Sequence, residues 1–328
     1  MTPRKPNLFV IGAMKSGTTY LAKILESHPL IFICRPEEPS YFVEPGQLRK
    51  LYPETWDLGY WKSEDRYLRL FEAAETATII GEASTNYTKQ PIVRYVPEKI
   101  RKFNPDARFI YIMRDPVERT ISHYWHMVRY HTERRPILPA IKEDPQYRDV
   151  SYYAMQLTAF FKCFERKQIQ VLTFEELTSR PNETIQDLYN WLEINPSLSE
   201  PLVTQAEHVT PQVVKMATCY GMLRWLRQSR PMRSVIPYVP HVIRRLGAQL
   251  AERAIDRQSI DTSEVISFLR PLQIRQTEEL SRLLGRGFPE WVTLYQNAVD
   301  DARPAGGSTP FASSEAQRSP ALKTAADA

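Results

Sequence analysis

Near its N-terminus the chain contains Leu8-Phe9-Val10-Ile11-Gly12-Ala13-Met14-Lys15-Ser16-Gly17-Thr18-Thr19-Tyr20-Leu21. Residues 8–13 form a short apolar run typical of a buried parallel strand, and residues 18–26 carry apolar side chains at helical spacing. The turn between them therefore leads into a helix N-terminus, where free N–H groups and the helix dipole favour an anion. Glycines allow the backbone to approach that anion closely, and Lys15 adds a positive charge. The stretch predicts a phosphate-binding loop.

The order of residues in this loop excludes the common triphosphate motif. A Walker A loop has its lysine directly after the second glycine, whereas Lys15 precedes Gly17. A strand, a glycine-containing turn and a helix also occur in α/β proteins without any ligand. The loop alone therefore leaves both a phosphate site and a purely structural turn open.

A second apolar strand is expected at residues 107–113, and Arg114-Asp115-Pro116 follows it. Proline suits the first position of a helix, so a helix should begin at Pro116. A guanidinium offers a forked and permanently charged grip on phosphate, and the hydroxyl of Ser122 near the helix start can donate another hydrogen bond. A local ion pair between Arg114 and Asp115 is the alternative interpretation.

A third short apolar strand is expected around residues 78–83, with the carboxylate of Glu82 near its C-terminal end. In open parallel sheets, ligands bind beyond the carboxyl ends of the strands. We therefore expect Lys15, Glu82 and Arg114 at one edge of a sheet, in an α/β protein whose strands alternate with helices. A surface glutamate or a helix-capping partner is the plainer interpretation of Glu82.

These segments together resemble the sulfotransferases that use 3′-phosphoadenosine 5′-phosphosulfate (PAPS). The pattern Gly12-x-x-Lys15-x-Gly17-Thr18-Thr19 and the eight-residue spacing from Arg114 to Ser122 carry the resemblance. It covers about residues 8–291 and points to the soluble bacterial type, similar to heparan-sulfate and carbohydrate sulfotransferase domains. It implies a three-layer α/β fold with a central parallel sheet flanked by helices and a P-loop-like phosphate-binding loop. PAPS would be the co-substrate, 3′-phosphoadenosine 5′-phosphate (PAP) would be the product, and no metal would be required.

The resemblance also implies a role for each site residue. The 5′-phosphosulfate would be bound by Lys15, Ser16, Gly17, Thr18 and Thr19, and the 3′-phosphate by Arg114 and Ser122. Glu82 would be the general base that takes the proton of the acceptor, and Lys15 would stabilise the leaving group. On this assignment Glu82→Gln should abolish most turnover while nucleotide binding survives.

The acceptor and the reaction class leave alternatives. A hydroxyl or amine of a saccharide or glycoconjugate is the first expectation, and a lipid or polyketide-type hydroxyl is the second. An atypical P-loop kinase and a non-catalytic nucleotide-binding module are the competing functions. His123, His126 and His131 follow the arginine motif, and His126 could assist near the acceptor or lie on a helix surface. A metal site is disfavoured because no third ligand has a recognisable spacing.

The composition fits an enzyme that needs no disulfides. The chain has 328 residues, of which 42% are hydrophobic, and three cysteines without C-x-x-C spacing, which indicates a reduced compartment. No apolar stretch approaches the roughly 20 residues of a membrane span. We therefore expect a cytoplasmic protein without a signal peptide.

The basic excess is local. Lysine and arginine number 43 against 38 acidic residues, a net charge of +5, and residues 215–254 hold seven arginines and one glutamate. This segment could be a lid over the nucleotide, an acidic-acceptor site, a membrane-surface contact or a solvated face. A nucleic-acid partner is not expected, because no matching motif accompanies it.

The expected organisation is one sulfotransferase domain over residues 1–300. It would comprise a nucleotide-binding core at about 7–195 and a helical acceptor or lid portion at about 196–300, followed by a disordered tail at 301–328. Residues 136–149 are expected as a surface loop, residues 151–166 as a helix opening with an S-x-Y-x-x-Q-L pattern, and residues 266–284 as a helix stopped by Gly285. The sequence leaves the oligomeric state open.

Overall fold

The computed structural model describes residues 4–130, 132–199, 213–217 and 252–296. Its centre is a five-stranded sheet in the order β2-β3-β1-β4-β5. The strands are β1 (Leu8–Gly12), β2 (Ile31–Ile33), β3 (Ile79–Ala83), β4 (Arg108–Met113) and β5 (Ile169–Thr173). All four neighbouring pairs are parallel. The predicted parallel sheet is therefore confirmed, and its carboxyl edge collects the loops that follow the strands.

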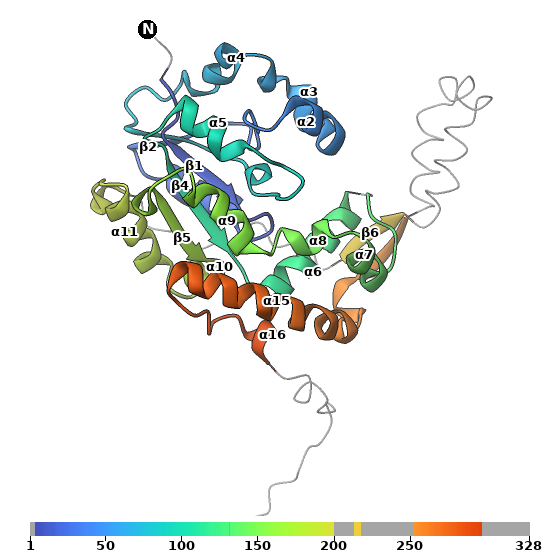
Figure 1. Ribbon diagram of the computed structural model, residues 1–328. Helices are drawn as coiled ribbons and strands as arrows, with labels where there is room; N and C mark the ends of the chain where they lie inside the picture. The colour runs from blue at the N-terminus through green and yellow to red at the C-terminus, as the bar shows by residue number, and fades with distance from the viewer. Residues whose placement is uncertain (1–3, 131, 200–212, 218–251, 297–328) are drawn as a thin grey trace, which may run out of the picture. The chain divides into compact units, whose positions relative to one another are not determined.

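Alternating side chains divide the core into two layers, one on each face of the sheet. Phe9 and Ile11 face the larger cluster, whereas Leu8 and Val10 face the smaller one. The larger cluster includes residues of α5 (Val96–Phe103), α6 (Pro116–Arg129), α9 (Tyr153–Phe161) and α15 (Ser263–Leu284). The smaller one includes residues of α1 (Thr18–Glu26) and α11 (Pro181–Trp191). Helices thus cover both faces, which confirms the three-layer α/β fold (Figure 1).

The remaining elements are short. They are α2 (Pro45–Leu51), α3 (Pro53–Leu58), α4 (Glu64–Leu68), α7 (Ile137–Glu143), α8 (Gln146–Asp149), α10 (Phe174–Ser179) and α16 (Val292–Tyr295). Two antiparallel strands, β6 (Val213–Ala217) and β7 (Glu252–Asp256), form a separate small sheet. Contacts join β6 to α6, so this hairpin lies beside the helix that follows β4.

Helix boundaries follow the local signals in the sequence at several places. α6 begins at Pro116, and Asp115 caps it by accepting hydrogen bonds from the N–H groups of Val117 and Glu118. α15 ends at Gly285, which adopts a left-handed φ of 70°. Both boundaries agree with the sequence prediction.

Two expectations about the middle of the chain were wrong. Residues 136–149 are not a loop but contain α7 and α8, because Ile137, Ala140 and Ile141 bury one helical face in the core. The helix expected to reach residue 166 ends at Phe161, since a further short helical turn at 166–168 precedes β5.

Most of the basic segment 215–254 and the predicted tail 301–328 lie outside the described residues. The predicted lid portion 196–300 is described only in part, so its boundaries stay a prediction. Among the helices that the structure describes, none combines the length and apolarity that crossing a membrane requires.

Candidate active site

The loop after β1 has the features of an anion cradle. Gly17 precedes α1 with a φ of 92°, and a Cβ there would lie 2.7 Å from Cδ2 of Phe174, so glycine is required. Within the described residues, no side chain caps the N-terminus of α1. The buried hydroxyl of Ser16 likewise has no hydrogen-bond partner among them. Unsatisfied donors at a helix N-terminus are available to an anionic ligand.

Lys15 lies where positive charges concentrate. Burial, together with the positive charges of four arginines, lowers its pKa to about 8; these are Arg114, Arg129, Arg257 and Arg119. Lys15 also adopts a φ of 69°, which is uncommon for a residue with a side chain. A bound anion would relieve this repulsion, so the electrostatics favour a negatively charged ligand at the loop.

Arg114 follows β4, which pairs with β1, so the structure brings Arg114 to the same sheet edge as Lys15. Its guanidinium lies 5.4 Å from the ring centre of Phe174, the residue that also packs beside Gly17. The Tyr153 hydroxyl donates a hydrogen bond of 2.7 Å to the Arg114 carbonyl, which fixes the backbone there. Ser122 is buried on α6, two helical turns beyond Arg114.

Glu82 lies deeper than expected. It pairs in register with Phe9 inside the sheet, and none of its surface is exposed. Tyr87 donates a hydrogen bond of 2.6 Å to Oε1, and Oε2 has no partner within the described part of the chain. Burial raises the pKa of Glu82 to about 8, although hydrogen bonding by Tyr87 and Tyr67 lowers it. Glu82 is therefore largely protonated at neutral pH and enclosed by aromatic side chains.

Glu38 is a second carboxylate, which the sequence reasoning missed. It follows β2 and accepts hydrogen bonds from Thr85 N (3.0 Å), Thr85 Oγ1 (2.6 Å) and Asn86 N (3.4 Å). The side chain is half-buried rather than enclosed. Burial raises its pKa, while the charge of Lys89 and these hydrogen bonds lower it. Glu38 is therefore held in place at the edge of the sheet, and the residue keeps some exposed surface, whereas Glu82 has none.

Lys89 connects Glu38 to the phosphate loop. Burial lowers its pKa to about 8, and the charge of Glu38 opposes that shift. Its ammonium donates a 3.2 Å hydrogen bond to the sulfur of Met14, the neighbour of Lys15, and lies 4.9 Å from the ring centre of Tyr52. A carboxylate, a second cation and an aromatic ring thus lie beside the loop.

The histidines of α6 are uncharged at neutral pH. Burial and the charges of Lys15, Lys89 and Arg129 lower the pKa of His126 to about 4. The pKa of His123 is lowered well below its usual range, mainly by burial. His126 therefore lies near both lysines, whereas His131 falls outside the described residues. In the described ranges, no group of three or more His, Cys, Asp or Glu could hold a metal ion.

The S-x-Y-x-x-Q-L pattern, residues 151–157, makes hydrogen bonds that hold the neighbouring segments in place. The side-chain amide of Gln156 bonds to both N and O of Gln90, at 2.8 and 3.0 Å, and so fixes the segment that carries Lys89. The Ser151 hydroxyl accepts a hydrogen bond from the buried guanidinium of Arg119 and donates one to the Pro116 carbonyl. Together with the contact of Tyr153 to Arg114, these bonds position the arginine motif at the start of α6 and the segment that carries Lys89.

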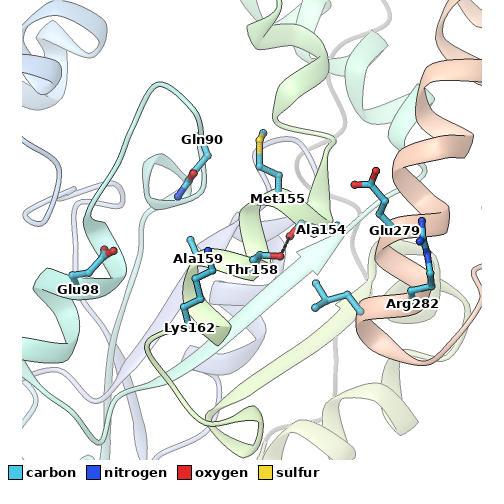
Figure 2. A pocket seen from close by; sticks show the side chains of 10 residues that line it. Gln90, Glu98, Ala154, Met155, Thr158, Ala159, Lys162, Glu279 and Arg282 are labelled. Atoms are coloured by element: carbon cyan, nitrogen blue, oxygen red, sulfur yellow. Dashed lines mark hydrogen bonds between the residues drawn. The ribbon is translucent and has the colours of Figure 1, made fainter.

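A groove of about 720 Å³ lies elsewhere, on the outer face of α9 (Figure 2). Ala154, Thr158 and Ala159 form its floor, while Gln90 and Glu98 lie on one side and Glu279 and Arg282 on the other. Its lining includes none of the predicted site residues. The titratable groups with shifted pKa values that could serve catalysis therefore lie at the sheet edge and not in this groove.

Comparisons with known proteins show which family the chain resembles. The model of the sulfotransferase family matches residues 6–197. Human heparan sulfate glucosamine 3-O-sulfotransferase 5 is 26% identical over 207 residues, covering 60% of this chain and 55% of the relative. The bifunctional heparan sulfate N-deacetylase/N-sulfotransferase 1 of Caenorhabditis elegans is 23% identical over 287 residues, covering 82% of this chain and 30% of that relative.

The chain thus spans about half of the human relative and less of the nematode one. Among solved structures, a sulfotransferase from Alicyclobacillus acidocaldarius has a TM-score of 0.61 at 23% identity, over 88% of this chain and 99% of its own, which supports the fold. Because the family model covers more than half of the residues, the chain belongs to the sulfotransferase family.

Proposed function

We propose that the protein transfers a sulfuryl group from PAPS to a hydroxyl or amine of an acceptor. The observation that carries the proposal is the lysine in the loop after β1, Lys15, which is partly buried near four arginines and whose pKa is lowered by burial and by their charges. That crowding stabilises a multiply charged anion, and PAPS carries phosphate at both its 5′ and its 3′ positions. Family membership supports sulfuryl transfer over the kinase and the non-catalytic alternatives.

The residues present fit such a nucleotide. The N-terminus of α1, the Ser16 hydroxyl and Lys15 would bind the 5′-phosphosulfate, together with Thr18 and Thr19 at the start of the helix. Arg114 and Ser122 would bind the 3′-phosphate. When bound, PAPS supplies the activated sulfuryl group and a phosphate leaving group.

The general base must touch the acceptor, and two carboxylates compete for this role. Glu82 has no exposed surface and would have to lose its proton before acting. Glu38 is half-buried, is oriented by Thr85 and Asn86, and lies near a lysine that favours its charged form. We therefore place the base at Glu38, which would keep Glu82 as a buried support for Tyr87, and retain Glu82 as the alternative.

The chain's own groups then account for each change in bonding. The acceptor oxygen or nitrogen forms a bond to sulfur while its proton passes to the carboxylate of Glu38. The bond from sulfur to the bridging oxygen breaks, and the ammonium of Lys15 neutralises the negative charge that develops on that oxygen. Lys89, which contacts Met14, and His126, whose pKa the charges of Lys15 and Lys89 lower, would assist near the transferred group.

A saccharide or glycoconjugate is the first acceptor class that we propose, because the matched relatives include heparan sulfate enzymes. A lipid or polyketide-type hydroxyl is the second. Tyr52 supplies an aromatic wall beside Lys89 that would suit either class.

Binding calorimetry with PAP and AMP tests the nucleotide assignment. We expect PAP to bind more tightly than AMP, and Arg114→Ala to remove that difference, because only PAP carries the 3′-phosphate. Equal affinities in the unaltered protein would contradict the assignment. Magnesium-dependent ATP consumption would instead support a kinase, and the absence of any sulfated product from labelled PAPS across an acceptor screen would support a non-catalytic module.

A further inference from the structure

An acidic side chain lies directly beside the arginine that we assign to the 3′-phosphate. Oε2 of Glu118 is 3.4 Å from Nη2 of Arg114, and both side chains are partly exposed, at 39% and 26%. Arg257 lies near the same pair, since its pKa is lowered by burial and by the charge of Arg114, whereas the charge of Glu118 raises it. A carboxylate at this position offsets part of the positive charge that a phosphate would use.

The C-terminal part of the described chain holds this carboxylate in place. Thr293 Oγ1 donates a hydrogen bond of 3.1 Å to Oε1 of Glu118. The neighbouring Leu294 N donates one of 2.9 Å to Oδ2 of Asp115, and Arg270 Nε donates one of 2.9 Å to the Thr293 carbonyl. α16 is therefore fastened to the first turn of α6, and Glu118 has a partner other than Arg114.

We propose that Glu118 is a specificity-determining residue that weakens the binding of nucleotides carrying a 3′-phosphate. The inference rests on the proposed function, in which Arg114 binds that phosphate. In the free protein Glu118 pairs with Arg114 and holds it in position. When a 3′-phosphate arrives, Arg114 is shared between two anions, and the like charges of phosphate and carboxylate repel each other.

Such a carboxylate has a use in catalysis. Every turnover ends with PAP, which retains both phosphates that the site recognises, so an all-cationic site would release its product slowly. Glu118 opposes this retention without touching the transferred group. Because Thr293 holds Oε1 independently of Arg114, the carboxylate stays beside the phosphate instead of swinging away.

Calorimetric titration of Glu118→Gln with PAP and with AMP tests the proposal. Glutamine keeps the size of the side chain and an acceptor for Thr293 but removes the charge. We expect the dissociation constant for PAP to fall about 3- to 10-fold, as expected for one screened unit charge a few ångströms away, and that for AMP to change less than about twofold. The gain should shrink at high ionic strength.

Glu183→Gln is the matched control. Glu183 also lies in the first turn of a helix, α11, and pairs with an arginine, Arg180, at 3.3 Å. It should leave both affinities unchanged, and thermal unfolding of both variants reports on the fold.

Two outcomes of Glu118→Gln would overturn the proposal. Weaker binding of PAP would mean that Glu118 serves to orient Arg114, and an equal change for PAP and AMP would mean a general structural role. A different result, no preference for PAP over AMP in the unaltered protein, would refute the nucleotide assignment itself.

Discussion

The two halves of the sheet's carboxyl edge differ in how their charges are balanced. Beyond β1 and β4 lie Lys15 and Arg114, and burial together with the surrounding arginines lowers the pKa of Lys15 to about 8. Beyond β2 and β3 lie Glu38 and Lys89, which oppose each other's pKa shifts. The first half has an excess of positive charge that an anion can satisfy, and the second half holds a carboxylate beside a cation.

This difference indicates a division of labour between neighbouring strands. An excess of positive charge suits the binding of a phosphorylated co-substrate and the stabilisation of its leaving group. A paired carboxylate suits the reversible uptake of one proton. The hydrogen bond from Lys89 to Met14 places the two halves in contact, so a group bound at the loop after β1 is within reach of the acceptor side.

Glutamine in place of Glu38 or of Glu82 should reveal the largest difference in turnover. We expect Glu38→Gln to lower turnover by about 10²- to 10⁴-fold, the range for loss of a general base, while PAP binding is retained. Glu82→Gln should lower turnover less than about tenfold, because Glu82 is largely protonated already and the amide still accepts from Tyr87. Initial rates with labelled PAPS measure both effects.

The reverse ranking would return the base to Glu82, as the sequence alone suggested. Affinity for PAP, measured on both variants, separates lost chemistry from lost binding. If Glu38→Gln weakened PAP binding as much as turnover, Glu38 would take part in nucleotide binding with Lys15 and Arg114. The proposed separation of nucleotide binding from proton uptake along the sheet edge would then be wrong.

Removal of the loop cation should produce the next largest effect. Lys15→Ala deletes the donor that we assign to the leaving oxygen, and comparable deletions cost about 3 kcal/mol of transition-state stabilisation, or about 10²-fold in rate. Single-turnover rates at saturating PAPS isolate this step. Lys15→Arg, which keeps the charge, should retain more activity than Lys15→Ala; equal losses would assign Lys15 a purely geometric role.

The sequence revealed Lys15 and Arg114, which follow β1 and β4, more readily than Glu38, which follows β2. Phosphate loops and arginine motifs are local, since a strand, a turn and a helix start within about a dozen residues reveal both Lys15 and Arg114. Glu38 follows a strand of only three residues, Ile31–Ile33, and its hydrogen-bond partner Thr85 lies 47 positions away. A pattern search has no local signal for such a contact.

The position of Glu82 shows the same limit. Its segment ends a true strand, β3, as predicted, but the register pairs Glu82 with Phe9 and so turns its side chain into the aromatic core. One residue of register decides which face a strand side chain occupies. The strand was therefore predictable, and the depth of its carboxylate was not.

The pH dependence of PAP binding should report on the charge of Lys15. Because the pKa of Lys15 is about 8 in the free protein, its charge is present below pH 8 and is lost as pH rises through that value. The affinity for PAP should therefore fall between pH 7 and pH 9. Lys15→Arg should flatten this fall, since an arginine stays charged throughout.

Lys89 titrates in the same range and needs its own control. If Lys15 and Arg114 bind PAP without help from Lys89, Lys89→Met should leave most of the pH dependence of the PAP affinity intact. A profile that Lys15→Arg does not alter, and Lys89→Met abolishes, would move the anion toward β3 and contradict the assignment of the loop.

Two glycines with left-handed backbones allow the steric cost of a side chain in the phosphate loop to be separated from backbone strain. This effect on stability is the smallest that we predict. Gly17 (φ 92°) would place a Cβ against the ring of Phe174, whereas Gly285 (φ 70°) has no described heavy atom within 4 Å of such a Cβ. Alanine at Gly285 should lower the free energy of unfolding by about 1 kcal/mol through backbone strain alone. Alanine at Gly17 should lower it by about 2 to 4 kcal/mol, because overpacking adds about 1 to 3 kcal/mol.

Denaturant unfolding of Gly17→Ala, Phe174→Ala and the double variant isolates the steric part as a coupling energy. The double variant should regain stability relative to the sum of the single losses, because the alanine methyl then has room. It should not regain the preference for PAP over AMP, since Phe174 also lies under the guanidinium of Arg114. If PAP preference returned together with stability, Phe174 would act only as a spacer, and the phosphate loop would not need the ring that joins it to Arg114.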